Sequence, residues 1–321
     1  MNPGRPAYVP DQGGRDIRRP CWRTALPAVT LGILLIVSGC GLFRPRQSKA
    51  PPPERHVIAV TLTGSRLLAL PLFVAMDDRI LRADGLGIRF GRTGIRIGPA
   101  GSFPVDGVLA WRSDAVLVTP GSDHSFRWAD LRHWPELAAA GLDRTEADWL
   151  KAVLVDHGVG ATRVDFLRVD AARRLLAGGH LPWLVLPLED AALLISQGAY
   201  AATFLGASTG PVPSLTISGT NRELPLLLAA LNQAEAIIRT TSARDLAGMV
   251  ARDYPGYKES TLQSLIATGQ GLGLWPPTTF LGRDVYERGR ALLAGIGVMW
   301  PDYSAGVRSA PELAALSHTG P

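Results

Sequence analysis

Residues 61–66 have the types and spacing that best suit anion binding in this chain. Hydroxyl groups come from Thr63 and Ser65, backbone N–H groups surround Gly64, and Arg66 adds a guanidinium. A guanidinium can hold an oxyanion through two parallel hydrogen bonds, and free N–H groups at a helix start favour the same charge. We therefore predict Thr63, Ser65 and Arg66 as ligand contacts. The alternative is a solvated turn with a surface arginine.

Other chemistry-bearing residues do not form a catalytic or metal-binding pattern. No serine stands in the Gly-x-Ser-x-Gly context of a nucleophile elbow. The histidines are scattered, without a His-x-x-x-His pair or a cysteine partner, which argues against zinc. The glycine-rich run 269–273 follows an expected helix and not a strand, which argues against a dinucleotide loop. We therefore predict no enzyme activity, no cofactor and no metal.

The elements around residues 61–66 position that loop. We expect a strand over 56–62, where β-branched residues dominate, and a helix over 71–81. Pro71 suits the first turn of this helix, because its missing N–H costs nothing there. A second strand is expected over 85–90. This strand–loop–helix–strand unit is the building block of a parallel sheet.

The rest of the chain continues the alternation and then becomes helical. In the helix expected over 145–157, Thr145 is the expected N-cap and Gly158 the stop. Strands are expected at 115–118, 164–169 and 184–186, and further helices at 128–131, 170–177, 191–196, 224–240, 243–253, 259–268 and 284–295. This order of elements predicts the α/β class.

The N-terminus reads as an export signal. Four arginines within residues 15–23 precede an apolar run over 25–37, and that run is shorter than the roughly 20 residues needed to cross a bilayer. It ends on Val37-Ser38-Gly39-Cys40, which resembles the lipobox of bacterial lipoproteins. The resemblance implies a signal peptide over 1–39 and a lipid on Cys40. The alternative is an uncleaved membrane anchor.

The composition of the chain after Cys40 indicates a tether and then a globular domain. Residues 40–55 are proline-rich and charged, so we expect an extended tether. Hydrophobic residues make up 46% and charged residues 19%, which is typical of a globular domain. The net charge is +5, of which the leader supplies +3 through five arginines and two aspartates, so nucleic-acid binding is not expected. With Cys21 lost in the leader, the mature chain has no disulfide.

Short motifs over residues 57–300 resemble, in order, the substrate-binding proteins of ABC importers that serve nitrate, sulfonates, taurine and thiamine-precursor pyrimidines. The motifs are Leu-Pro-Leu-Phe-Val-Ala-Met from 70, Gly-Leu-Gly-Ile from 85, Trp-Ala-Asp-Leu from 128, Asp-His-Gly from 156, Leu-Leu-Ala-Gly-Gly from 175 and Leu-Trp-Pro from 274. The resemblance implies a two-lobed fold of class II periplasmic-binding-protein type. Two crossing strands would form the hinge, and the ligand would lie in the cleft.

The resemblance also implies lobe boundaries. Lobe one would comprise about 56–118 and 197–306, lobe two about 119–196, and 307–321 would be a flexible tail. In lobe two, the resemblance implies that Glu189 faces the cleft, and the alternative, which we favour, is an acid that stabilises the dipole of its own helix. Trp111 and Trp183 could line a cleft or lie in the core.

Two departures from the family pattern bear on the ligand site. The glycine-rich stretch between Phe90 and Val116 is too short for the family's second helix and third strand, so we expect a reduced lobe one. Residues 137–141 look helical where a strand and a ligand loop should stand, and Pro182 replaces an expected aspartate.

The sequence therefore predicts a monomeric, lipid-anchored solute receptor. It would sit on the outer face of the cytoplasmic membrane or in the periplasm and deliver a small organic anion or related solute to an ABC permease. The alternative is a degenerate binding-protein fold that acts as a cell-surface partner-binding or regulatory module.

Overall fold

The computed structural model describes residues 56–77, 80–83, 85–121, 126–133, 136–160 and 162–308. The expected signal peptide, Cys40 and its tether lie outside these residues, as does the chain from 309 onward. Their assignments stay predictions. Among the helices within the described ranges, none has the length and apolarity needed to cross a bilayer.

The first lobe contains a five-stranded mixed sheet in the order β2-β1-β3-β10-β4. Strand β1 is parallel to β2 and β3, whereas β10 is antiparallel to β3 and β4. Its strands are β1 (His56–Leu62), β2 (Leu86–Phe90), β3 (Ile95–Pro99), β4 (Gly107–Ala110) and β10 (Leu215–Ser218). Its helices are α1 (Leu70–Asp77), α2 (Ile80–Ala83), α7 (Leu224–Thr240), α8 (Ala243–Val250), η2 (Ala251–Asp253) and α9 (Glu259–Leu272).

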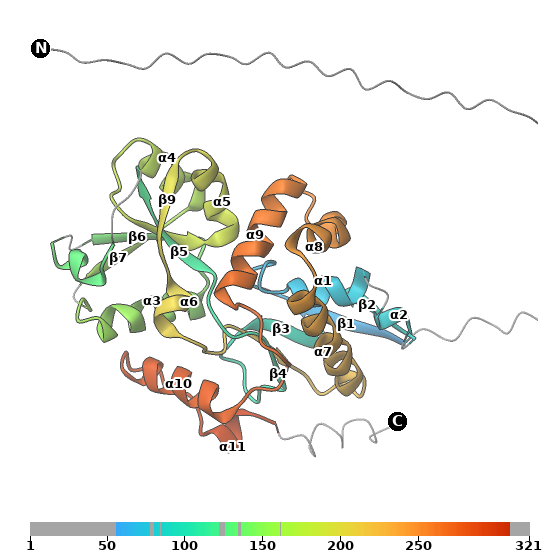
Figure 1. The fold of residues 1–321 in the computed structure, drawn as a ribbon. Coiled ribbons are helices and arrows are strands. Elements are labelled where there is room, and N and C mark those ends of the chain that lie inside the picture. The colour runs from blue at the N-terminus through green and yellow to red at the C-terminus, as the bar shows by residue number, and fades with distance from the viewer. Residues whose placement is uncertain are drawn as a thin grey trace, which may run out of the picture. The chain divides into compact units, whose positions relative to one another are not determined.

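The second lobe contains a second sheet in the order β7-β6-β8-β5-β9 (Figure 1). Strand β6 is parallel to β7 and β8, whereas β5 is antiparallel to β8 and β9. The strands are β5 (Ala115–Pro120), β6 (Glu136–Ala140), β7 (Arg163–Leu167), β8 (Leu184–Pro187) and β9 (Ala199–Phe204). The helices are η1 (Trp128–Arg132), α3 (Arg144–Asp156), α4 (Val169–Ala177), α5 (Leu188–Ser196) and α6 (Leu205–Thr209).

The two sheets have the same topology. In each sheet, the chain enters the antiparallel strand (β10 in the first lobe, β5 in the second) directly from the other lobe. Strand β5 follows β4 through residues 111–114, and β10 follows β9 through residues 205–214. These two crossovers lie side by side, because Val212 N donates to Trp111 O at 2.7 Å and Ser214 N to Ala110 O at 2.9 Å. The predicted two-lobed α/β class is confirmed.

The sheet pairing moves the expected lobe boundaries. Strands β5 and β9 pair in the second sheet, so lobe two begins near residue 112 and ends near 209. The expected boundary at 118/119 falls inside β5, and the one at 196/197 falls between α5 and β9, because neither the pairing nor β9 was evident from local patterns.

Two local predictions also change. Residues 136–140 form strand β6 and not a helix, because four of its five residues are buried between two layers and small alanines fit there. Tertiary packing thus overrides the helix propensity of alanine. The glycine-rich stretch after Phe90 holds no helix, as expected, but it does contain both β3 and β4, so the reduced lobe one keeps a full sheet.

Alternating residues of the second sheet contribute to two apolar clusters. One face, with Val116 and Val118, joins the core that also contains the first lobe's β1, α1 and α7. The other face, with Leu117, packs in a second cluster with α3 and the C-terminal helix α10 (Arg283–Ala294). The largest side chains of this cluster include Trp149 from α3 and Tyr286 from α10. Figure 1 shows α10 lying beside α3. After α9 in the first lobe, the chain therefore passes to the second lobe once more and forms α10 there.

The end of the described chain returns to the first lobe. After α11 (Tyr303–Gly306), Val307 forms a bridge with Val105, and Arg308 N donates to Val105 O at 2.8 Å. The Arg308 guanidinium lies 2.8 Å from the fully buried carboxylate of Asp106. The folded domain therefore extends at least to Arg308, so residues 307 and 308 belong to it and not to the expected tail.

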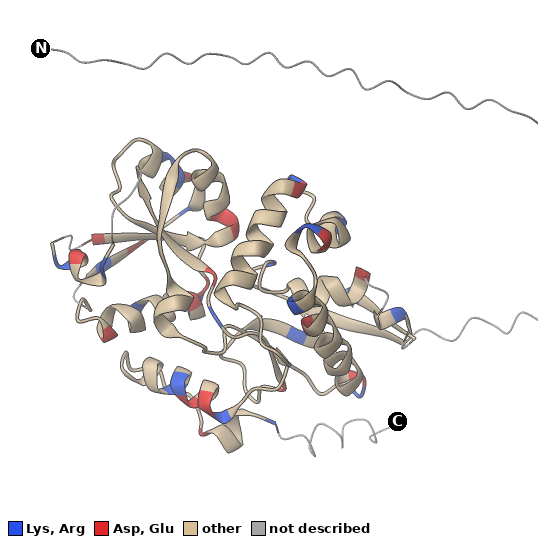
Figure 2. Cartoon of the chain, in the orientation of Figure 1, with Lys and Arg blue, Asp and Glu red and all other residues tan. Residues whose placement is uncertain are grey.

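Positive and negative residues are interspersed over both lobes in Figure 2, without a continuous basic stripe in that view. This distribution agrees with the absence of a basic block in the sequence.

The Asp106–Arg308 pair makes a pH-dependent prediction about stability. Burial raises the pKa of Asp106 to about 6, although Arg308 and the Gly219 N–H favour its charged form. Ionisation of Asp106 therefore costs stability as the pH rises through this value. We expect Arg308→Ala to lower the free energy of unfolding by about 3 kcal/mol near pH 7.5, and by less near pH 5.

Urea denaturation at both pH values measures this difference. Arg174→Ala, an exposed arginine on α4, is the matched control and should change stability little at either pH. An equal loss for Arg308→Ala at both pH values would contradict the charge argument.

Candidate ligand cleft

A cavity of about 670 Å³ lies between the two lobes. Its volume is in the range typical of small-molecule sites. Four segments contribute most of its lining, namely the loops after β1 and after β3 in lobe one, the start of α3 in lobe two, and residues 298–301 near the C-terminus.

The lobe-one wall begins where β1 and β3 end. Thr63 and Gly64 follow β1, and residues 100–103 follow β3, which itself contributes Arg96 and Pro99. Gly98 permits this arrangement, because a Cβ on Gly98 would collide with the Thr63 hydroxyl oxygen. The Thr63 hydroxyl, which was predicted to contact ligand, can therefore lie beside β3 because residue 98 has no side chain.

The lobe-two wall is the N-terminus of α3. Asp143 Oδ1 accepts from Glu146 N at 2.9 Å, and Glu146 Oε2 accepts from Asp143 N at 3.1 Å. This reciprocal capping box makes Asp143 the N-cap, so the prediction of Thr145 was wrong. The Thr145 hydroxyl instead donates to Ala100 O of lobe one at 2.7 Å and joins the two walls.

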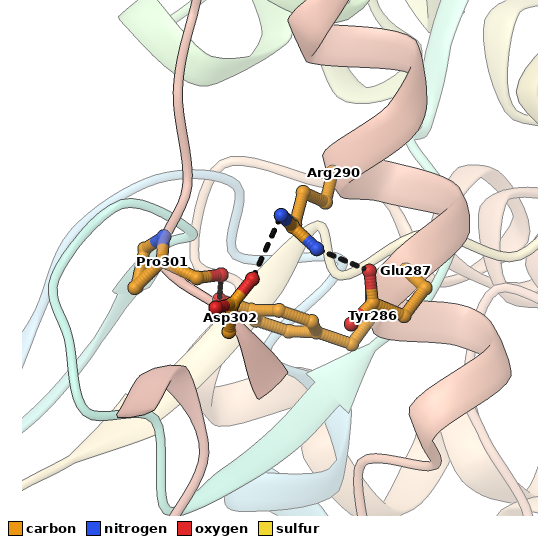
Figure 3. Close-up of polar contacts among 5 residues, drawn as sticks. All are labelled: Tyr286, Glu287, Arg290, Pro301 and Asp302. Carbon is orange, nitrogen blue, oxygen red and sulfur yellow. Dashed lines mark hydrogen bonds and ion pairs between the residues drawn. The ribbon is translucent and has the colours of Figure 1, made fainter. Parts of the chain in front are cut away.

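A polar network holds the C-terminal wall. Tyr286 Oη donates to Pro301 O at 2.8 Å, and Arg290 spans Glu287 and Asp302, each at 2.8 Å (Figure 3). Trp300 packs edge-to-face on Trp149 of α3 and on Phe103 of the β3–β4 loop. The cavity wall at 298–301 is therefore anchored to both lobes.

The charges lining the cavity come from both lobes. Arg96 projects from lobe one and Arg144 from lobe two, and within the described ranges neither has a carboxylate at ion-pair distance. Asp143 and Asp148 also line it. Asp148 lies 3.6 Å from Lys151, and burial, together with the charge of Asp148, raises the pKa of Asp143. The two arginines are thus the positively charged residues on the lining, and neither forms an ion pair with a described residue.

The residues predicted in the 61–66 loop separate in the structure. Only Thr63 lines the cavity. Ser65 Oγ donates to Asp114 Oδ2 at 2.8 Å and faces the crossover. Arg66 donates to Asp253 O, and its guanidinium carbon lies 5.2 Å from the ring centroid of Phe73. Ser65 and Arg66 therefore contact protein groups.

The other predicted residues lie around the cavity or away from it. Glu189 opens α5 and accepts a hydrogen bond from Leu67 N, while burial and then the charge of Asp114 raise its pKa to about 7. Trp111 lies in the crossover and donates to Gly273 O at 2.8 Å. Trp183 is buried in lobe two, before β8, at the end of the strand opposite the cleft.

Sequence reasoning missed Arg96, Arg144 and Trp300. The Ile95-Arg-Ile97 alternation is a period-two strand signal with Arg96 on the other face. Asp143 and Glu146 have the three-residue spacing of a capping box, which would have placed Arg144 at the helix start. No local signal predicts that Trp300 returns to this cavity.

The Tyr286–Pro301 hydrogen bond supports a prediction about the C-terminal wall. Tyr286→Phe removes the only donor that the described residues offer to Pro301 O while keeping the buried ring. We expect a loss of about 1–2 kcal/mol in unfolding free energy and faster amide exchange around residues 298–303. Hydrogen–deuterium exchange checks this. Tyr200→Phe, on the exposed edge strand β9, should leave both quantities unchanged.

No protein-family model and no curated protein matches this sequence. Solved structures do match its fold. The aliphatic sulphonate binding protein SsuA from Escherichia coli has a TM-score of 0.55 at 13% identity, over 76% of this chain and 86% of that one. The alkanesulfonate-binding protein SsuA from Xanthomonas axonopodis pv. citri, bound to MOPS, has a TM-score of 0.56 at 15% identity, over 81% and 99%.

Two further matches differ in what their names describe. A ligand-binding component of an ABC-type import system from Staphylococcus aureus, with zinc bound, has a TM-score of 0.59 at 10% identity, over 83% of this chain and 99% of that one. A mutant of DszB, solved in complex with biphenyl-2-sulfinic acid, has a TM-score of 0.50 at 15% identity, over 81% of this chain and 98% of that one. The names of the matched structures therefore describe different ligands.

With two interleaved α/β sheets, paired crossovers and a cavity between the lobes, the chain has the fold of the periplasmic solute-binding proteins of ABC importers.

Proposed function

We propose that this protein is the extracytoplasmic solute receptor of an ABC importer and binds a small organic anion in the interlobe cleft. The observation that carries this proposal is the pair Arg96 and Arg144, which line one cavity from opposite lobes without a counterion in the described structure. An anion between them would contact both lobes. Binding would then favour the closed arrangement of the lobes.

In the proposed site, side chains and not free N–H groups at a helix start would bind the anion. The N–H of Glu146 in the first turn of α3 already binds the Asp143 carboxylate, so it is not free for a ligand. Guanidinium groups must supply the charge, and the hydroxyls of Thr63 and Ser102 lie on the same lining. Phe103, Met299 and Trp300 offer apolar surface for the organic part.

Delivery to a permease and anchoring through Cys40 complete the proposal. The matched solute-binding proteins support a role outside the cytoplasm, and the lipobox-like sequence supports the anchor. We propose transport and not catalysis, because the chain's two cysteines, at 21 and 40, both precede the folded domain and no nucleophile motif occurs in the sequence.

Isothermal titration calorimetry tests the proposal on the full-length protein. The titrants are hexanesulfonate, taurine, nitrate and an aminopyrimidine. We expect one anion per chain, and we expect Arg96→Gln and Arg144→Gln each to weaken binding by about tenfold or more, since each removes a charge-assisted hydrogen bond.

Two exposed arginines outside the cavity serve as controls. Arg89→Gln lies on β2 of the same sheet as Arg96, and Arg244→Gln lies in the first turn of α8, as Arg144 does in α3. Both should bind like the unmodified protein. A folded protein that binds none of the titrants would favour the partner-binding alternative, and equal losses in test and control variants would contradict the assigned site.

A further inference from the structure

A buried carboxyl group stands at the point where the chain first crosses between the lobes. Asp114 has no solvent exposure and does not line the cavity. Its Oδ2 accepts from Ser65 Oγ at 2.8 Å, and Ser65 Oγ in turn accepts from Leu68 N at 3.3 Å, at the turn that leads into α1. Asp114 O accepts from Leu188 N at 3.1 Å, at the start of α5. Asp114 therefore binds both lobes.

The second oxygen of Asp114 faces a different kind of partner. Oδ1 has no N–H or hydroxyl donor among the described residues, and the neighbouring group with which the Asp114 carboxyl interacts is the carboxyl of Glu146. Glu146 is 6% exposed and lies in the first turn of α3. Two carboxyl groups can share a hydrogen bond only while one of them carries a proton.

Burial and then the charge of Asp114 raise the pKa of Glu146, so the proton resides on Glu146 when Asp114 ionises. Burial raises the pKa of Asp114 to about 6, with the hydrogen bonds from Ser65 and Glu146 opposing this shift. The pair, Asp114 and Glu146, therefore loses its last proton above this value, as two coupled groups do in sequence.

The pair connects the two walls of the cleft. Ser65 follows directly on Thr63 and Gly64, which line the cavity from lobe one. Glu146 forms the capping box with Asp143 and follows Thr145, which lines the cavity from lobe two. A continuous chain of hydrogen bonds thus runs from one wall through the crossover to the other.

We propose that Asp114 and Glu146 are positioning residues of the ligand cleft, whose one shared proton holds the two walls at the separation that binds the ligand. The inference rests on the proposed function. When the proton is lost, two adjacent carboxylates repel and α3 separates from the crossover, so ligand affinity falls as the pH rises.

Neighbouring charges do not replace the proton. The charge of Glu189 on α5 and that of Asp143 on α3 have the same sign as the pair and strengthen the repulsion. Two arginines lie nearby, but among the described residues neither forms an ion pair with Asp114 or Glu146. Arg112 in the crossover donates to Gly206 O at 3.1 Å, and Arg66 donates to Asp253 O.

The test compares the full-length protein at about pH 6.5, where the pair carries one proton, and at about pH 9, with two measurements. Calorimetry with hexanesulfonate gives the affinity, and amide exchange of residues 63–68 and 143–147 reports the two walls without any ligand. We expect the affinity to fall about tenfold or more with rising pH and both segments to exchange faster.

Glu146→Gln is the decisive variant. Its amide can donate to Asp114 and accept from Asp143 N as the protonated glutamic acid does, but it cannot titrate. We expect this variant to keep the low-pH affinity and slow exchange at both pH values. Glu235→Gln is the matched control, since Glu235 is another fully buried acid with a raised pKa, on α7 outside the cleft. It should keep the unmodified pH dependence.

Either of two results would overturn the proposal. One is a wild-type protein whose wall segments exchange alike at both pH values, and the other is a Glu146→Gln protein with the wild-type pH dependence. If hexanesulfonate does not bind, the proposed function fails for this ligand, and the amide exchange still decides the role of the pair.

Discussion

The structure depends on one constraint, namely that each sheet takes its antiparallel strand from the other lobe. Strands β5 and β10 enter through crossovers that are hydrogen-bonded to one another, so neither sheet is complete without chain from the other lobe. The cleft lies beside this exchange. Its walls are the strand ends and helix starts that the two sheets present to each other. The geometry of the site is therefore set by backbone pairing and not by the side chains that line it.

The positive groups available to a ligand in the cleft depend on which groups already bind the N–H groups at each helix start. Asp143 occupies the N-terminus of α3, and Glu189 takes the N–H of Leu67, so carboxylates of the chain itself occupy positions where a bound anion would otherwise lie. Arginine side chains remain as the available positive groups. The buried acids beneath the cleft then become part of its construction, because they can be accommodated only by sharing a proton.

Much of the fold could be predicted from local pattern. The bounds of β1 and α7 match the sequence expectation, because a β-branched run and a long amphipathic stretch are local signals that predict a strand and a helix without knowledge of the tertiary structure. Strands β6 and β10 could not be predicted, since alanine-rich or short segments become strands only when a sheet is there to pair with. The site was predicted less well. Thr63 follows a recognisable strand, whereas Arg96 and Trp300 reach the cavity through long-range packing.

The return of the C-terminus to lobe one determines when the cleft can form. Val307 pairs with Val105, and residues 298–301 line the cavity, so contacts about two hundred residues apart must close before the binding site is complete. A chain that emerges from a translocation channel N-terminus first would fold its first β–α–β unit early and hold an unfinished cleft until the last described residues have appeared. Only the finished polypeptide would then have a complete binding site. A chain truncated before α10 would have both sheets but would lack the wall that residues 298–301 give the cavity.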